Sequence, residues 1–122
     1  MLISTLRNIP GRVVRATGFS CRGLKAAFLQ EEAFRLEVLG LALLGAVLAA
    51  CPWPLWKKAA LTAAYLLIPL AELFNSALED FCNLVSPDYN PLAGQVKDKG
   101  SAAVLLAIVI NVLVLLALCL AG

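Results

Sequence analysis

The sequence contains no histidine, and its four cysteines lie far apart. Structural zinc sites combine cysteine and histidine ligands at short spacings such as CxxC. No CxxC pair occurs here, so a structural zinc site is not expected. We interpret the cysteines as small, inert buried residues. They are Cys21, Cys51, Cys82 and Cys119.

Charge is also scarce, since 15% of the residues are charged and the formal net charge is +2. So small a charge does not indicate a nucleic-acid-binding protein, and no nucleic-acid partner is expected. The sequence also lacks a glycine-rich phosphate loop ending in GK[ST] and the motifs of protein kinases. A nucleotide site would have to be built in another way.

Apolar residues are abundant and make up 61% of the 122 residues, with a mean hydropathy of +0.88. Soluble domains are about half apolar. The length is enough for one compact domain. We therefore expect a single membrane domain over residues 1–122.

Three apolar stretches are expected to be transmembrane helices, over residues 38–56, 59–85 and 101–122. The first is slightly short for a bilayer core, which takes roughly 20 residues, and it is broken near Pro52 and Pro54. The third is apolar from Ala102 to Leu120, with Asn111 as its only strongly polar residue.

The N-terminal segment, residues 1–37, has a different pattern. From Gly11 to Glu37, basic and acidic residues are interleaved with apolar ones such as Val14 and Phe28. This pattern indicates an amphipathic helix that lies in the membrane interface. The scattered apolar residues and the lack of a cleavage pattern argue against a signal peptide.

The lysines and arginines predict the orientation. Eight of the ten lie before the first span or in the segment 86–100, and only Lys57 and Lys58 lie between the first two spans. By the positive-inside rule, the N-terminal helix and the segment 86–100 are cytoplasmic and the C-terminus lies outside. The segment 86–100 is polar and contains Pro and Gly, so we expect a loop there.

Glu72, Asn75 and Glu79 lie in the second span. Their offsets of three and seven residues place them on one face of a helix. Carboxylates and amides are costly inside a membrane unless they face a partner, water or a metal. We therefore interpret this face as a functional site.

An oligomer is expected, because three short spans make a thin monomer that could not hide Glu72 and Glu79 from lipid. Small residues such as Gly40, Gly45 and Ala63 recur in the spans. Membrane helices use small residues to approach one another closely. Alanine is also simply common in spans, so no single position decides the matter.

Further charged residues extend the candidate site. Glu31 and Glu32 lie in the N-terminal helix, with Arg12 and Lys97 among the basic residues on the same predicted side. Carboxylates suit Mg²⁺, which binds through one or two acids plus substrate phosphates. Such groups are those that phosphoryl transfer requires. Lys97 could contact a phosphate, or it could be a solvated residue at a helix start.

Four stretches occur in a specific order: Ala-Thr-Gly-Phe-Ser-Cys-Arg-Gly-Leu-Lys-Ala-Ala (16–27), Glu-Glu-Ala-Phe-Arg-Leu-Glu (31–37), Ala-Glu-Leu-Phe-Asn-Ser-Ala-Leu-Glu (71–79) and Ala-Gly-Gln-Val-Lys-Asp-Lys-Gly-Ser-Ala-Ala-Val (93–104). Their order, their spacing and the three-span layout resemble the small integral-membrane diacylglycerol kinases of bacteria, a family that includes undecaprenol kinases. The resemblance extends from Arg12 onward. Its most specific part is Glu-x-x-Asn-[ST]-Ala-x-Glu followed by Ala-x-x-x-Lys-Asp.

The resemblance implies an all-α homotrimer in a bacterial inner membrane. Each subunit would have one amphipathic surface helix and three transmembrane helices, and active sites at the cytoplasmic boundary would be shared between subunits. The implied reaction transfers the γ-phosphate of MgATP to the hydroxyl of a membrane lipid. The residues of the motifs resemble those of the diacylglycerol enzymes more than those of the undecaprenol kinases. Diacylglycerol, which would give phosphatidic acid, is therefore the expected lipid, and undecaprenol is the alternative.

The resemblance also implies roles for single residues. Glu72 would be the general base, Asn75 a polar group that orients it, and Glu31 and Glu79 the Mg²⁺ ligands. The residues implied to contact the nucleotide are Arg12, Phe19, Glu31, Glu79, Asp88, Tyr89, Asn90, Lys97 and Asp98. Those implied to line the lipid pocket are Arg12, Ala33, Phe34, Arg35, Leu36, Glu37, Glu72 and Ser101. The helical pattern by itself supports Glu72 and Glu79 and does not say which is the base.

Two positions near the implied nucleotide depart from the family pattern. Asn90 stands where many members have His, and Asn83 stands where Asp is common. Asn83 removes a negative charge, and Asn90 removes an imidazole. Neither change removes an essential acid.

Two other classes of protein are compatible with part of the pattern. A small proton-coupled transporter also uses an intramembrane Glu, but it would not need the Lys97-Asp98 stretch. A purely structural subunit would not need Glu72, Asn75 and Glu79 on one face. ATP consumption that depends on added lipid distinguishes a kinase from both.

Overall fold

The computed structural model describes residues 1–122, apart from the side chain of Leu2. It contains five helices, which are α1 (Leu2–Arg7), α2 (Ile9–Gln30), α3 (Glu32–Ala50), α4 (Leu55–Val85) and α5 (Pro91–Leu120). Three of them, α3, α4 and α5, are long and apolar enough to cross a membrane. The predicted all-α class and the presence of three candidate spans are therefore confirmed.

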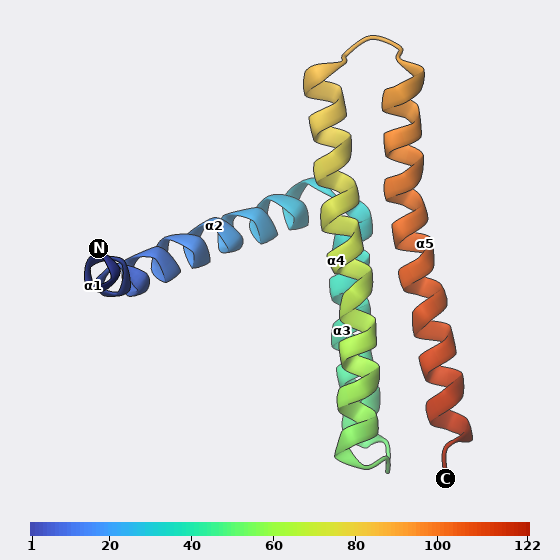
Figure 1. Cartoon of the computed structure of the whole chain (residues 1–122). Coiled ribbons are helices and arrows are strands. Elements are labelled where there is room, and N and C mark those ends of the chain that lie inside the picture. Colours follow the sequence, from blue (N-terminus) through green and yellow to red (C-terminus); the bar gives the residue numbers. More distant parts are fainter.

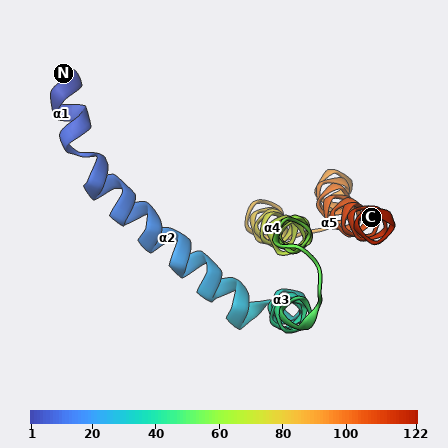
Figure 2. The same cartoon turned by 90° about the horizontal axis from the view of Figure 1, so that it is seen from below.

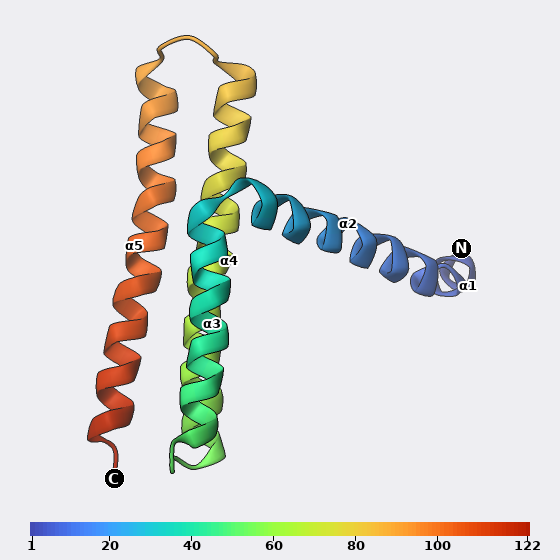
Figure 3. The same cartoon turned by 180° about the vertical axis from the view of Figure 1, so that it is seen from behind.

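The three long helices run side by side, and α4 contacts both α3 and α5. Seen along the helix axes, α3 and α5 lie against different sides of α4 (Figure 2). α2 leaves this bundle sideways, and the N-terminus lies at its far tip (Figures 1 and 3). We call the two ends of the bundle the 86–90 end and the 51–54 end, after the segments that connect its helices there.

A single residue separates α2 from α3. Glu31 has extended backbone angles, with φ −106° and ψ 114°. The last carbonyls of a helix lack partners within the helix. Here the Arg35 guanidinium donates hydrogen bonds of 3.1 Å to the carbonyls of Phe28 and Leu29. Arg35 thus stabilises the end of α2 at the point where the chain turns into the bundle.

The helix boundaries differ from those predicted. α2 ends at Gln30 and α3 begins at Glu32, so the stretch 32–37 belongs to the first span and not to the N-terminal helix. α5 begins at Pro91, and only 86–90 remains of the loop predicted over 86–100. Pro91 suits a first helical turn, and the Asn90 side chain accepts a hydrogen bond of 2.9 Å from the Leu92 N–H. The polar residues of 91–100 therefore belong to the first turns of α5 and not to a loop.

The length of α4 and α5 places the 86–90 end beyond the α2–α3 junction. A helix of 31 residues is about 46 Å long, whereas the bilayer core is about 30 Å thick. Figure 1 shows α4 and α5 continuing past the point where α2 joins α3. The upper turns of both helices therefore stand clear of the apolar layer when α2 lies along its surface.

Polar side chains hydrogen-bond α5 to α4 at several heights, and Asn111 is the first example. Asn111 Nδ2 donates to the Ala64 carbonyl at 2.7 Å and to the Ala107 carbonyl of its own helix at 2.9 Å. This explains the only strongly polar residue in the apolar run of α5, because a polar group in an apolar layer needs a partner.

Lys57 provides a second example, at the 51–54 end. It is 5% exposed, and its ammonium donates to the carbonyl of Leu118 at 2.9 Å and to that of Ala121. The rings of Trp53 and Trp56 lie 5.5 and 5.6 Å from the same ammonium. A cation at the C-terminal carbonyls of α5 is favourable, because those groups carry partial negative charge.

The interior of the bundle is small. The apolar residues that are buried near the 51–54 end are Leu48, Leu61 and Leu118. Large apolar residues such as Leu43, Leu105 and Leu113 are more than half exposed. Exposed apolar surface on this scale requires lipid or another protein chain to cover it.

Candidate active site

Four carboxylates gather where α2, α3 and α4 meet. Glu31 comes from the α2–α3 junction, Glu37 from α3, and Glu72 and Glu79 from α4. Glu72 lies close enough to Glu31, Glu37 and Glu79 for their charges to interact. We call these four residues the acid cluster. Repulsion among its members favours a cation nearby.

Glu31 is held in the cluster by a residue that the sequence did not single out. The Ser76 hydroxyl donates to Glu31 Oε1 at 2.8 Å. Ser76 lies one turn after Glu72 on α4, so the bond joins the helix junction to the face that carries Glu72. Its place inside the stretch 71–79 was the only signal available in the sequence.

Asn75 is buried on this face and is 8% exposed. Its Nδ2 is 3.5 Å from Glu79 Oε1, a long hydrogen bond. Asn75 Oδ1 is buried and has no hydrogen-bond partner in the described part of the chain. It points at Gly100 of α5, where a Cβ atom would collide with it. Gly100 was also not predicted as a site residue, and it lets α5 approach Asn75.

Glu37 faces Glu72 from α3. Its Oε2 atom is buried and finds no partner among the described residues. Its main-chain carbonyl accepts a hydrogen bond of 2.6 Å from the hydroxyl of Tyr65 on α4. Glu37 is thereby linked to α4 through its backbone as well as through the charge of its side chain.

A second polar group lies nearer the 86–90 end. Lys97 of α5 donates to Asn83 Oδ1 on α4 at 2.7 Å. Asp98 is exposed. Asn83 is a neutral partner, so the Lys97 charge stays available to an anion.

The connecting segment holds three predicted nucleotide contacts, Asp88, Tyr89 and Asn90. Tyr89 is 93% exposed. The Asp88 carbonyl accepts a hydrogen bond of 3.4 Å from the Ser86 hydroxyl, and the Asn90 side chain caps α5. These residues line a shallow depression together with Lys97.

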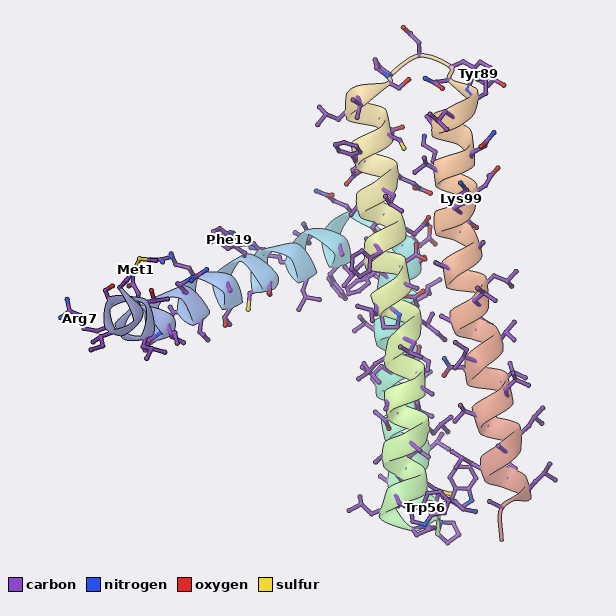
Figure 4. The ribbon with its side chains drawn as sticks, viewed as in Figure 1. Met1, Arg7, Phe19, Trp56, Tyr89 and Lys99 are labelled. Atoms are coloured by element: carbon purple, nitrogen blue, oxygen red, sulfur yellow. The ribbon has the colours of Figure 1, made fainter. Side chains whose placement is uncertain are left out.

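Not all predicted site residues meet within one chain. Arg12 and Phe19 lie on the exposed helix α2, where the Phe19 ring is 4.8 Å from the Arg22 guanidinium. Figure 4 shows Phe19 on α2 well away from Tyr89 at the 86–90 end. A nucleotide could not contact both in a single copy of this chain.

The residues predicted to line the lipid pocket also do not meet at one place. Phe34 is buried and lines an apolar groove of about 290 Å³ between α2, α3 and α4, which Leu73 also lines. Arg35 caps α2, while Ala33, Leu36 and Ser101 are exposed. The groove reaches Leu73 of α4, the residue that follows Glu72, and no member of the acid cluster lines it.

The acid cluster has the donor chemistry for Mg²⁺, which prefers carboxylate oxygens. Among the described residues, no three acid, cysteine or histidine side chains are arranged to hold a metal by themselves. Mg²⁺ does not need three, since it binds through one or two carboxylates plus phosphates and water. Glu31 and Glu79 therefore fit the role of ligands to a metal that arrives with a nucleotide.

Known proteins are similar to this chain in sequence. A family model described as prokaryotic diacylglycerol kinase matches residues 18–119. The diacylglycerol kinase of Escherichia coli strain K12 is 40% identical over 108 residues, which cover 84% of each chain. That of Pseudomonas aeruginosa is 38% identical over 99 residues, covering 81% of this chain and 80% of the relative. That of Haemophilus influenzae is 32% identical over 102 residues, covering 80% and 83%.

Proposed function

The chain belongs to the prokaryotic diacylglycerol kinase family and is a diacylglycerol kinase, and we propose that its acid cluster is the catalytic centre. The reaction moves the γ-phosphoryl group of MgATP to the free hydroxyl of diacylglycerol and yields phosphatidic acid and ADP. The observation that carries this assignment is the half-buried Glu72, which has three other carboxylates around it.

Glu72 is the proposed general base. The lipid oxygen bonds to the γ-phosphorus while the bond from that phosphorus to its bridging oxygen breaks, and ADP leaves. The hydroxyl proton passes to the Glu72 carboxylate. Phosphoryl transfer depends mainly on positioning and on charge neutralisation, so little further chemistry is required of the protein. Asn75, one turn away, keeps the α4 face in register with α5.

Glu31 and Glu79 are the proposed residues for Mg²⁺. When bound, the ion neutralises charge on the phosphates of the nucleotide. Ser76 keeps Glu31 turned toward α4 by its hydrogen bond. The Asn75 amide, 3.5 Å from Glu79 Oε1, orients the second acid within α4.

The nucleotide and the lipid would approach from two sides. Lys97 offers its charge to a phosphate, with Asp98 and the segment 88–90 beside it. The groove between α2, α3 and α4, which Phe34 lines, would take an acyl chain. It reaches Leu73, the residue that follows Glu72 on α4, so a lipid headgroup at that end would lie toward the base. Exposed Ala33, Leu36 and Ser101 would face the lipid outside this groove.

We also propose a homotrimer with shared active sites. Phe19 lies on α2 well away from the 86–90 end of its own chain (Figure 4), and Arg12 precedes it on the same helix, farther from the bundle. In a ring of copies, α2 of one chain can reach the α4–α5 pair of another. The chain is an inner-membrane protein of the bacterial family, and we propose that α2 and the 86–90 end face the cytoplasm and the C-terminus the outside.

Transfer of radiolabelled phosphate from MgATP in mixed micelles tests the function, with diacylglycerol and undecaprenol in parallel. We expect label on diacylglycerol, and a drop in kcat of at least about a hundredfold for Glu72→Gln, since the base is lost. Glu32→Gln is the matched control, because this exposed acid lies beside the cluster and outside it. Full activity of Glu72→Gln would overturn the assignment of the base, and label mainly on undecaprenol would overturn the assignment of the lipid.

A further inference from the structure

Tyr65 lies within the apolar part of α4, seven residues before Glu72 and on the same face. A tyrosine hydroxyl in such a place requires a hydrogen-bond partner. It donates to the main-chain carbonyl of Glu37 on α3 at 2.6 Å. The bond therefore connects the helix that carries Glu72 to the backbone of another member of the acid cluster.

Gly40 makes this contact possible. It lies one turn after Glu37 on α3, directly against the Tyr65 ring. A Cβ atom at Gly40 would collide with the Tyr65 hydroxyl oxygen and would lie 3.3 Å from Cζ. Close approach over a small residue is the usual way to set the register of two membrane helices. The Tyr65–Gly40 contact thus contributes to how α3 and α4 are placed along each other.

The same register determines where the Glu37 carboxylate lies. Its Oε2 is buried and has no partner among the described residues, so no side-chain bond holds it. What orients Glu37 is its backbone, and Tyr65 is the α4 residue bonded to that backbone. A shift of α3 along α4 would therefore move Glu37 relative to Glu72.

We propose that Tyr65 is a positioning residue for phosphoryl transfer, which holds Glu37 opposite Glu72 by binding the Glu37 carbonyl across Gly40. The proposal rests on the proposed function, in which Glu72 is the base, and on the place in the lipid pocket that the family resemblance implies for Glu37. Tyr65 touches neither the nucleotide nor the reacting hydroxyl. Its effect is on the alignment of the lipid with Glu72, to which transfer rates are sensitive.

Tyr65→Phe tests the proposal, since it removes the hydroxyl and keeps the ring. We expect kcat with diacylglycerol to fall about fivefold, the value of one hydrogen bond, while KM for MgATP stays the same. Thr62→Val is the matched control, because the Thr62 hydroxyl on the same helix donates only to Lys58 of its own helix at 2.8 Å. Thr62→Val should keep the kcat of the unmodified protein.

Two double variants separate positioning from a general loss of stability. In a Glu37→Gln background, Tyr65→Phe should cause no further fall in kcat, because the carboxylate through which it acts is gone. Gly40→Ala should lower kcat, and the pair Gly40→Ala with Tyr65→Phe should be no worse than Tyr65→Phe alone, because the colliding atom is removed. Unfolding of each variant in the same micelles is measured alongside.

An unchanged kcat for Tyr65→Phe would overturn the proposal. The proposal would also be overturned if the fold-reduction in kcat of the double variant Tyr65→Phe with Glu37→Gln equalled the product of the two single reductions. Residues that act independently give such a product, whereas residues that act through each other do not. Glu72→Gln is assayed in parallel. Activity in that variant would count against the proposed base, whereas the coupling between Tyr65 and Glu37 is read from variants that retain Glu72.

Discussion

Asn75 is a buried polar residue on the acid face of α4, and a glycine on the next helix defines its surroundings. The Asn75 carbonyl oxygen points at Gly100, where there is no room for a Cβ atom. Asn75 also has its amide near Glu79, a proposed Mg²⁺ ligand. A change at Gly100 therefore reaches the acid cluster through Asn75, although Gly100 has no side chain to contribute.

Gly100→Ala is expected to lower the free energy of unfolding by about 1–3 kcal/mol, since the added methyl overpacks the α4–α5 contact. It should also raise the Mg²⁺ concentration that gives half-maximal activity, because Asn75 is pushed toward Glu79. Unfolding in micelles and a Mg²⁺ titration of activity measure the two effects.

Gly94→Ala is the matched control for this prediction. Nothing lies within 4 Å of the Cβ that it adds to α5. Alanine is favoured over glycine in helices by about 1 kcal/mol, so this variant should be as stable as the unmodified protein or slightly more stable. Equal behaviour of the two variants would contradict the role given to Gly100.

Two asparagines that depart from the family pattern have defined partners. Asn83 accepts a hydrogen bond from Lys97, and Asn90 caps α5. An aspartate at residue 83 would form an ion pair with Lys97, whereas the amide leaves the lysine charge uncompensated. The amide therefore preserves the placement of Lys97 while changing the local charge.

Among the helices, α4 is the central one. It carries Glu72, Asn75 and Glu79, and it packs against both other spans. Its polar ties lie at different heights, with Lys57 at the 51–54 end and Tyr65 nearer the acid cluster. Each tie satisfies a polar group inside an apolar layer and at the same time sets a helix register.

Lys57→Met is expected to lower the free energy of unfolding by about 1–3 kcal/mol, because the carbonyls of Leu118 and Ala121 lose a charged donor. At a temperature well below the transition, kcat should stay unchanged, since the acid cluster lies toward the other end of the bundle. Denaturation in micelles, followed by circular dichroism, gives the stability.

Lys58→Met is the control for that element. Lys58 is the neighbouring cation and is only partly buried. Lys58→Met should change the free energy of unfolding by less than about 0.5 kcal/mol, as surface substitutions usually do. A loss equal to that of Lys57→Met would mean that net charge, and not the contact with α5, stabilises this end.

At the scale of the whole molecule, a single copy of the chain leaves most of its apolar surface uncovered. The bundle buries few side chains, and α2 extends away from it (Figures 1 and 2). Arg12 and Phe19 are exposed on α2. Association of copies would cover apolar surface and would bring α2 to a neighbouring α4–α5 pair.

Mixing two inactive variants tests the shared site. If Arg12 and Glu72 of one site come from different chains, then Arg12→Ala mixed equally with Glu72→Gln should recover about a quarter of the unmodified activity. Glu31→Gln mixed with Glu72→Gln should stay inactive, because Glu31 is bonded to Ser76 of its own α4. No recovery in the first mixture, from verified mixed oligomers, would place each site within a single chain.

Much of this protein could be predicted from its sequence because the relevant signals are local. Hydropathy identified the three spans, since a bilayer core requires long apolar helices. Helical periodicity placed Glu72, Asn75 and Glu79 on one face, and the motif order identified the family. Boundaries were less accurate, because polar turns of α5 that extend out of the membrane have the composition of a loop.

The sequence by itself determined the helical class, the number of candidate spans, the stripe of acids and the family. Only the tertiary structure decided which residues meet across helices: Ser76 with Glu31, Tyr65 with Glu37 over Gly40, Gly100 with Asn75, and Lys57 with the end of α5. The physical reason is that periodicity defines the face of a helix but not its height against a neighbour. That height follows from close packing and from the need of each buried polar group for a partner.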